Sequence, residues 1–306
     1  MQKENLLKTL KKFEHPYESD RTLSDIDKQT IENDLNRTDF GFSNSRRNIK
    51  KLKLFLYILQ KSFAEPPIQY FQGMMEIATV LIDAYFGGIE VGFDTDENST
   101  IYVKVNDIID AEKQEFDVIL ENNKELFQKY QNSLANILED KFLYLTKNDF
   151  QKYNLLNSKF ITMVNFMKTT MFKSYNIKLE KSNSFKYMNH TLSFFKRLSA
   201  NSEVIFTIFN LILNSDHGMI FCILAFYLKK ADEFSGNNAI LSENERSKLL
   251  ISEISETDIK KILKIHDTFL KEKYKRAHWS FLEKHTNLGI FLGMILLAFA
   301  IALLNK

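Results

Sequence analysis

Apolar side chains recur at every third or fourth position over most of the chain, which is the pattern of amphipathic helices. The spacing predicts a helix over 47–63, which Pro66 and Pro67 end, and a second over 73–86, which Gly87 and Gly88 end. Further helices are expected over 108–129, 133–146, 157–173, 186–199, 202–214, 217–231, 242–253 and 257–275. The chain is therefore predicted to be all-α, with one multi-helix domain.

Residues 89–105 depart from this pattern. The runs IEVGF and TIYVKV alternate in a strand-like way and flank the acidic run DTDENS. A small hairpin and an inserted loop are both compatible with this segment. The composition still favours helices elsewhere, because the only three prolines lie in the first quarter of the chain and there are only 9 glycines.

The segment 288–304, LGIFLGMILLAFAIALL, has no charged or polar side chain. As a helix it would span about 25 Å, just enough for the hydrocarbon core of a bilayer. The alternative is a buried terminal helix of a soluble domain, which would usually carry some polar residues. We expect a C-terminal transmembrane anchor in a tail-anchored topology. Lys284 and His285 precede it, as expected if residues 1–287 face the cytosol. The short span favours the thin membrane of the endoplasmic reticulum or early Golgi.

Charge and cysteine content limit the kinds of partner and the cellular compartment that the sequence is compatible with. A net charge of +2 gives no field directed at nucleic acid. The single cysteine, Cys222, allows no disulfide within the chain, which fits a reducing compartment. The first 27 residues lack the continuous apolar run of a secretory signal and are expected to form a loosely attached polar arm.

Metal and nucleotide motifs are incomplete or missing. Asp94, Asp96 and Asn98 match the first ligands of a calcium loop, but Ser99 and Val105 stand where such a loop needs Gly and Glu. A solvated acidic loop is the better interpretation. There is no HExxH zinc motif and no phosphate-binding GxxxxGK[ST] loop. We expect no metal and no cofactor of the chain's own.

Two short segments carry the strongest functional signal. Residues 30–40 contain I-x-x-D-x-x-R-T and residues 69–77 contain Y-x-Q-G-M. In this order, the pair resembles the first two signature motifs of the TBC domain, a family of Rab GTPase-activating proteins. Residues 187–228 resemble a later TBC segment, although Phe209-Asn210 replaces the usual Trp-Asp pair and the only tryptophan, Trp279, lies elsewhere.

The resemblance implies an activator that completes a partner's active site. Arg37 and Gln72 would be the catalytic residues, inserted beside the GTP and Mg²⁺ that belong to the Rab. An arginine supplied in this way stabilises the charge of the transition state. Asp34 would orient the Arg37 guanidinium from one helical turn away. The supporting residues would be Asp34, Thr38, Tyr70, Gly73 and Met74.

The resulting layout is a TBC-like domain over 28–232 with 89–105 as an insertion, a helical extension over 233–287 and the anchor. Some TBC proteins of the early secretory pathway share this layout, which implies a role in vesicle trafficking. The alternative is a non-catalytic, tail-anchored scaffold that binds a Rab. A more ordinary interpretation is that Arg37 caps one helix and Gln72 starts another. A SNARE-like fusion protein ranks lower, because the apolar pattern of 257–287 turns polar before the anchor.

Overall fold

The computed structural model describes residues 1–18, 25–68, 70–71, 73–92, 103–142, 191, 193–216, 218–237 and 253–271. Throughout these ranges the regular structure is helical, which confirms the all-α class. The helices are α1 Gln2–Leu10, α2 Asp25–Leu35, α3 Ile49–Ala64, α4 Met74–Phe86, α5 Asp110–Asn122, α6 Lys124–Ile137, α12 Ser202–Asn214 and α13 Gly218–Asn237, followed by a helix over 256–271. Shorter turns of helix are η1 Lys11–Phe13, η2 Asn44–Arg47, η3 Val105–Asp107, η4 Leu138–Phe142 and η7 Lys196–Leu198.

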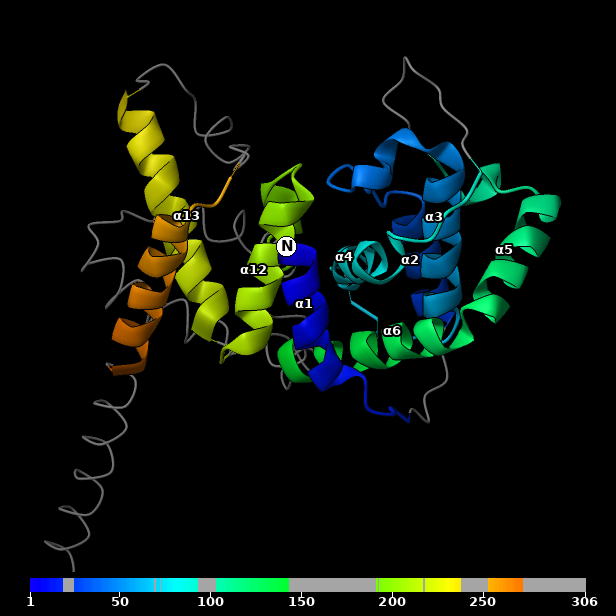
Figure 1. Ribbon diagram of the computed structural model, residues 1–306, viewed down its shortest axis with the longest axis horizontal. Helices are drawn as coiled ribbons and strands as arrows, with labels where there is room; N and C mark the ends of the chain where they lie inside the picture. The colour runs from blue at the N-terminus through cyan, green and yellow to red at the C-terminus, as the bar shows by residue number, and fades with distance from the viewer. Residues whose placement is uncertain are drawn as a thin grey trace, which may run out of the picture.

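Helix α4 is the centre of the fold. Every residue of α4 except Glu76 is buried, which is expected for a helix that is apolar on all sides. Figure 1 shows α4 end-on, with α1 and α12 on one side, α2 and α3 on the other and α6 below it. The two segments with TBC-like motifs therefore adjoin the most buried part of the molecule, because α2 ends in one and α4 begins in the other.

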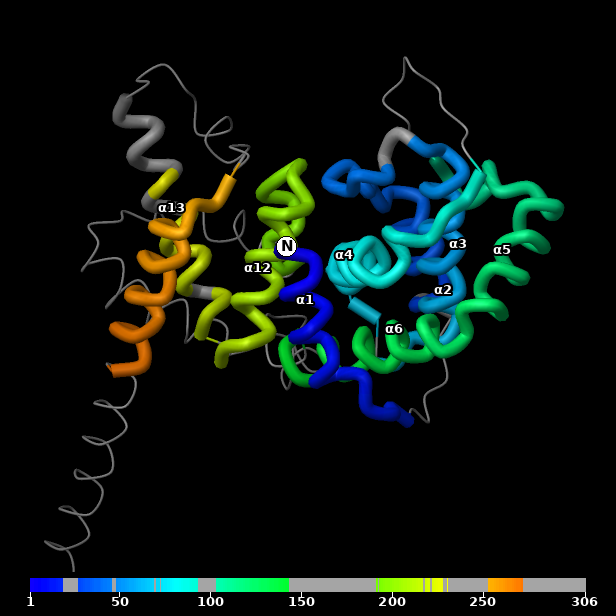
Figure 2. Tube along the Cα trace, viewed as in Figure 1, coloured from blue at the N-terminus to red at the C-terminus, as the bar shows by residue number. Residues whose placement is uncertain are grey.

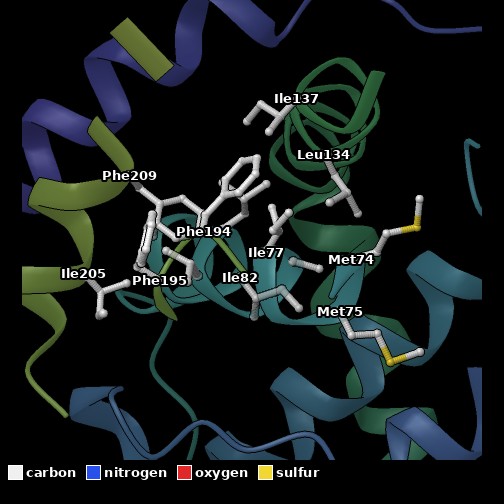
Figure 3. Close-up of a cluster of buried hydrophobic side chains, with 14 of the residues drawn as sticks. Met74, Met75, Ile77, Ile82, Leu134, Ile137, Phe194, Phe195, Ile205 and Phe209 are labelled. Atoms are coloured by element: carbon white, nitrogen blue, oxygen red, sulfur yellow. The ribbon is translucent and has the colours of Figure 1, made fainter. Parts of the chain in front are cut away.

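The core around α4 is built from segments far apart in the sequence. Met74 and Ile77 of α4 face Leu134 and Ile137 of α6 (Figure 3). The aromatic side chains on the other side come from the turn before η7 and from α12, namely Phe194, Phe195 and Phe209. The abundance of phenylalanine, 27 in all, thus supplies bulky packing material where helices converge.

The N-terminus is not the loosely attached arm that the sequence predicts. Leu6 and Leu10 of α1 are fully buried, and α1 lies between α12 and α4 (Figure 2). The Thr9 hydroxyl donates to the Asn210 side chain at 2.6 Å, and Lys12 donates to Asn214 at 2.8 Å. This segment is polar overall, so its composition did not indicate helix α1, whose two buried leucines are four residues apart.

Most predicted helices are present, with shifts at the ends. Residues 202–214 form α12 as expected, and 47–63 and 73–86 correspond to α3 and α4. The predicted helix over 108–129 is instead two helices, α5 and α6, which meet at Asn123. The helix expected over 133–146 does not start separately: residues 133–137 are the end of α6, and the π-helical turn η4 follows. Residues 193–199 are turns and η7 rather than helix, because Phe194 and Phe195 both adopt positive φ angles.

Other expectations are tested in part or not at all. Residues 89–92 and 103–104 contain no strand, and Val105 begins η3, so the described flanks do not form a hairpin. The segments 93–102, 157–173, 242–252 and 272–306 lie outside the described residues. At the end of the described chain the helix over 256–271 packs on α13. A Cβ on Gly218 would come 2.1 Å from the Phe269 ring, so only glycine fits this contact.

Candidate functional site

The first motif segment ends α2 and forms the turn that follows. Ile31 and Leu35 are buried and attach α2 to the core. The amide of Arg37 donates to the Asp34 carbonyl at 3.1 Å, and the amide of Thr38 donates to the Leu35 carbonyl at 3.3 Å. Arg37 is exposed in this turn, two residues after Leu35, the last residue of α2. Its guanidinium is therefore accessible to a partner while its backbone is fixed by α2.

Thr38 connects this turn to both helices. Its hydroxyl donates to the Asp34 carbonyl at 2.8 Å, which satisfies one of the free carbonyls at the end of α2. The same hydroxyl lies 3.7 Å from the Met75 sulfur, on α4. Thr38 is 8% exposed. Its predicted supporting role corresponds to a structural link between the turn and α4.

The second motif segment packs directly against the first. The Tyr70 hydroxyl donates to the Asp34 carboxylate at 2.7 Å. The Tyr70 ring is buried and meets the Phe63 ring edge-on, with 5.7 Å between the centroids. Burial, together with the nearby Asp34 carboxylate, raises the pKa of the Tyr70 hydroxyl, so it remains a donor at neutral pH. This hydrogen bond joins the two motifs, which are 36 residues apart at these positions.

Gly73 and Met74 start α4. Gly73 has φ 109° and ψ −23°, a left-handed conformation that other residues rarely adopt, so a glycine is required at this point of the turn. Met74 is fully buried in the core. Gln72, one residue before Gly73, lies outside the described residues. The structure therefore brings together Asp34, Arg37, Thr38, Tyr70 and Gly73, and leaves the position of the Gln72 side chain open.

Asp34 has a partner other than the one that the sequence predicts. Its carboxylate accepts from Tyr70, and within the described residues no ion pair joins it to Arg37. The predicted geometry assumes that both residues lie on one helix, but α2 ends at Leu35. In this structure Asp34 joins the two motif segments and does not orient the guanidinium.

An ion cluster beside the motif segments was not predicted. Glu76, in the first turn of α4, pairs with Lys196 at 2.7 Å and with Arg197, both from η7. Burial alone would raise the pKa of Glu76, but the two cations more than offset it and hold that pKa below its usual range. The available signal was Glu76 itself, the only acidic residue in the first turn of an apolar helix.

In the third TBC-like segment, residues 187–228, the pair that departs from the family pattern is Phe209-Asn210, and both side chains have structural roles. Phe209 is fully buried in the core and contacts the Phe194 ring at a centroid distance of 5.7 Å. The Asn210 side chain accepts from Thr9 and lies 3.0 Å from the Asn214 amide. This asparagine thus holds α1 against α12.

The described residues contain no group of three acidic, histidine or cysteine side chains placed to hold a metal ion. Nor does any helix within them have the length and apolarity to cross a membrane, and the predicted anchor, 288–304, lies outside them. The predicted anchor therefore stays a prediction.

Together, the fold and site define a helical protein with an exposed arginine in a turn that contacts Tyr70 and the start of α4 through Asp34 and Thr38. No protein-family model matches the chain, and no solved structure matches it. The chain is similar to an uncharacterized membrane protein of Encephalitozoon cuniculi, with 27% identity over 240 residues. The alignment covers 72% of this chain and 76% of that relative.

Proposed function

We propose that this protein is a TBC-type activator that accelerates GTP hydrolysis by a Rab GTPase at a membrane. The observation that carries the proposal is the hydrogen bond of 2.7 Å between Tyr70 and Asp34. It connects the two segments whose motifs resemble the TBC signature, and such a contact is not needed if the matches are accidental. The exposed Arg37 lies three residues beyond Asp34.

The chemistry of the proposal needs few groups from this chain. GTP hydrolysis passes through a loose, highly charged transition state, and an arginine supplied by a partner accelerates it about 10³–10⁵-fold. Arg37 is suited to this role because its planar guanidinium can contact several phosphate oxygens at once. GTP and Mg²⁺ are held by the Rab, so the activator needs no cofactor of its own.

Gln72 is the second catalytic residue of the proposal. A glutamine amide can accept a hydrogen bond from the attacking water and donate one to the γ-phosphate. Its neighbour Gly73 carries no side chain, which would let the backbone approach a partner closely. Tyr70, on the other side of Gln72, is fixed by Asp34 and Phe63.

A membrane location is the third part of the proposal. The apolar segment 288–304 is long enough to span a bilayer, and the relative from Encephalitozoon cuniculi is named a membrane protein. Rabs are lipid-anchored, so a tethered activator would meet them at a raised local concentration. The shortness of the segment supports the endoplasmic reticulum or early Golgi and a role in vesicle trafficking.

The test is phosphate release from a panel of GTP-loaded Rabs with the full-length protein in detergent micelles. We expect stimulation of at least one Rab, and a loss of about 10³-fold in Arg37→Ala or Gln72→Ala. Arg37→Lys should not restore activity, because an ammonium lacks the planar fork. Lys124→Ala is the matched control, since Lys124 is an exposed cation on α6.

Two outcomes would contradict the catalytic proposal. Full activity in both Arg37→Ala and Gln72→Ala would show that these two residues are not catalytic. Tight binding of a GTP-loaded Rab without faster hydrolysis would instead support the alternative function, a non-catalytic scaffold that binds a Rab.

A further inference from the structure

Lys196 is a buried lysine that contacts both motif segments at once. It is 5% exposed, and its ammonium donates to the Glu76 carboxylate at 2.7 Å. It also donates to the main-chain carbonyl of Asp39, two residues after Arg37. A buried ammonium needs such partners, because a charge removed from water without them is strongly destabilising.

The surroundings of Lys196 fix it in one place. Its ammonium lies 5.3 Å from the centre of the Phe42 ring, which adds a cation–π contact. The two preceding residues, Phe194 and Phe195, hold strained positive φ angles while their side chains are fully buried. Burial of the two rings therefore fixes the turn before η7 in the core. This turn places Lys196 against the Arg37 turn and α4.

We infer that Lys196 is a positioning residue that holds the Arg37 turn in register with the first turn of α4. Its two acceptors lie in the two motif segments: Asp39 is two residues after Arg37, and Glu76 is in the first turn of α4. One side chain from the C-terminal half of the domain thus joins the Arg37 turn to the first turn of α4. The catalytic part of this inference rests on the proposed function, whereas the structural part does not.

Lys196→Met is the informative variant, because it keeps the length of the side chain and removes the ammonium. Arg197 still pairs with Glu76 through its Nε, at 3.0 Å, so the variant does not leave that carboxylate unpaired. Lys53→Met is the matched control. It removes a similar half-buried ion pair, Lys53–Glu112 at 2.8 Å, which joins α3 to α5.

The first measurement is hydrogen–deuterium exchange of the full-length protein in detergent micelles. The amides of Arg37, Thr38 and Ser43 report on the turn, since each donates to a nearby carbonyl. We expect their exchange in Lys196→Met to rise about tenfold, the scale of one lost hydrogen bond, while Lys53→Met leaves them unchanged. Lys196→Arg should restore protection because it keeps the buried charge.

The second measurement is phosphate release from a GTP-loaded Rab, stimulated by the wild type or by each variant. A misplaced arginine affects the transition state more than binding, so kcat should fall at least about tenfold with KM changed less than about threefold. Unchanged exchange in the turn, or faster exchange over the whole chain, would overturn the inference. If exchange rises in the turn but the wild type stimulates no Rab, the proposed function fails and the positioning role stands.

Discussion

At the scale of single residues, the site depends on a few buried polar contacts rather than on Arg37 alone. Asp34, Thr38 and Tyr70 join the two motif segments, and Glu76 with Lys196 holds them from the other side. These groups are buried or half-buried, so their hydrogen bonds are costly to break. The backbone of the exposed Arg37 is thus held by fixed neighbours, which in the proposed function would lower the entropy lost on docking to a Rab.

The Glu76 cluster should make stability depend on pH. The pKa of Glu76 is lowered in the folded state, so its contribution is present above the unfolded pKa and is lost as pH falls through the folded value. Glu76→Gln should be less stable than the wild type by about 1–3 kcal/mol at neutral pH. This difference should shrink as pH falls below the unfolded pKa of about 4.3, and it should vanish below the lowered folded pKa, where the carboxyl is protonated in both states. Urea unfolding followed by circular dichroism, repeated across pH, measures it.

A matched substitution separates this effect from general acid unfolding. Glu125 also pairs with a lysine, Lys129 at 2.5 Å, but its side chain is exposed on α6. Glu125→Gln should therefore behave like the wild type at every pH. A Glu76→Gln difference that stays constant down to acidic pH would show that the cluster acts through packing and not through charge.

The sequence could predict only the local part of this site. Asp34, Arg37, Tyr70 and Gly73 belong to two short segments, so their spacing is readable without a structure. Lys196 is 120 residues from Glu76, and no periodicity links such a pair. The Tyr70–Asp34 bond is equally invisible, because a helical spacing suggests Asp34–Arg37 instead.

At the scale of elements, helix ends could be predicted where the sequence contains breakers or a continuous apolar pattern. Pro66-Pro67 and Gly87-Gly88 set the ends of α3 and α4, and the uninterrupted apolar run set α12. The break at Asn123 has no such signal, since the apolar spacing continues across it. The turn at Phe194 and Phe195 is contrary to local preference and depends on burial of the two rings.

Helix α1 provides the prediction at this scale. Leu6 is fully buried where α1 meets α12, whereas Leu7, on the same helix, is only partly buried. Leu6→Ala should lower the free energy of unfolding by about 2–5 kcal/mol, and Leu7→Ala by clearly less. Urea unfolding of the two variants measures this. Equal, small losses of unfolding free energy in both variants would support the loosely attached arm that the sequence suggests.

At the scale of the whole molecule, the described helices bury one continuous core around α4, and both proposed catalytic residues belong to segments adjoining it. In the proposed function, this arrangement would separate catalysis from membrane attachment along the chain. The site is formed by elements between α2 and η7, whereas the apolar segment 288–304 lies beyond the last described helix. A protein built in this way can lose one function and keep the other.

Removing 288–306 should therefore release the protein from membranes without reducing its stimulation of a Rab in solution. Carbonate extraction of cell membranes followed by immunoblotting measures the first effect, and phosphate release measures the second. An unrelated apolar segment of equal length should restore membrane attachment, because length and apolarity suffice to span a bilayer. Retention of the shortened protein in the carbonate-resistant pellet would mean that another segment binds the membrane. Loss of stimulation in solution would mean that 288–306 supports the fold of the site, so that attachment and catalysis are not separable.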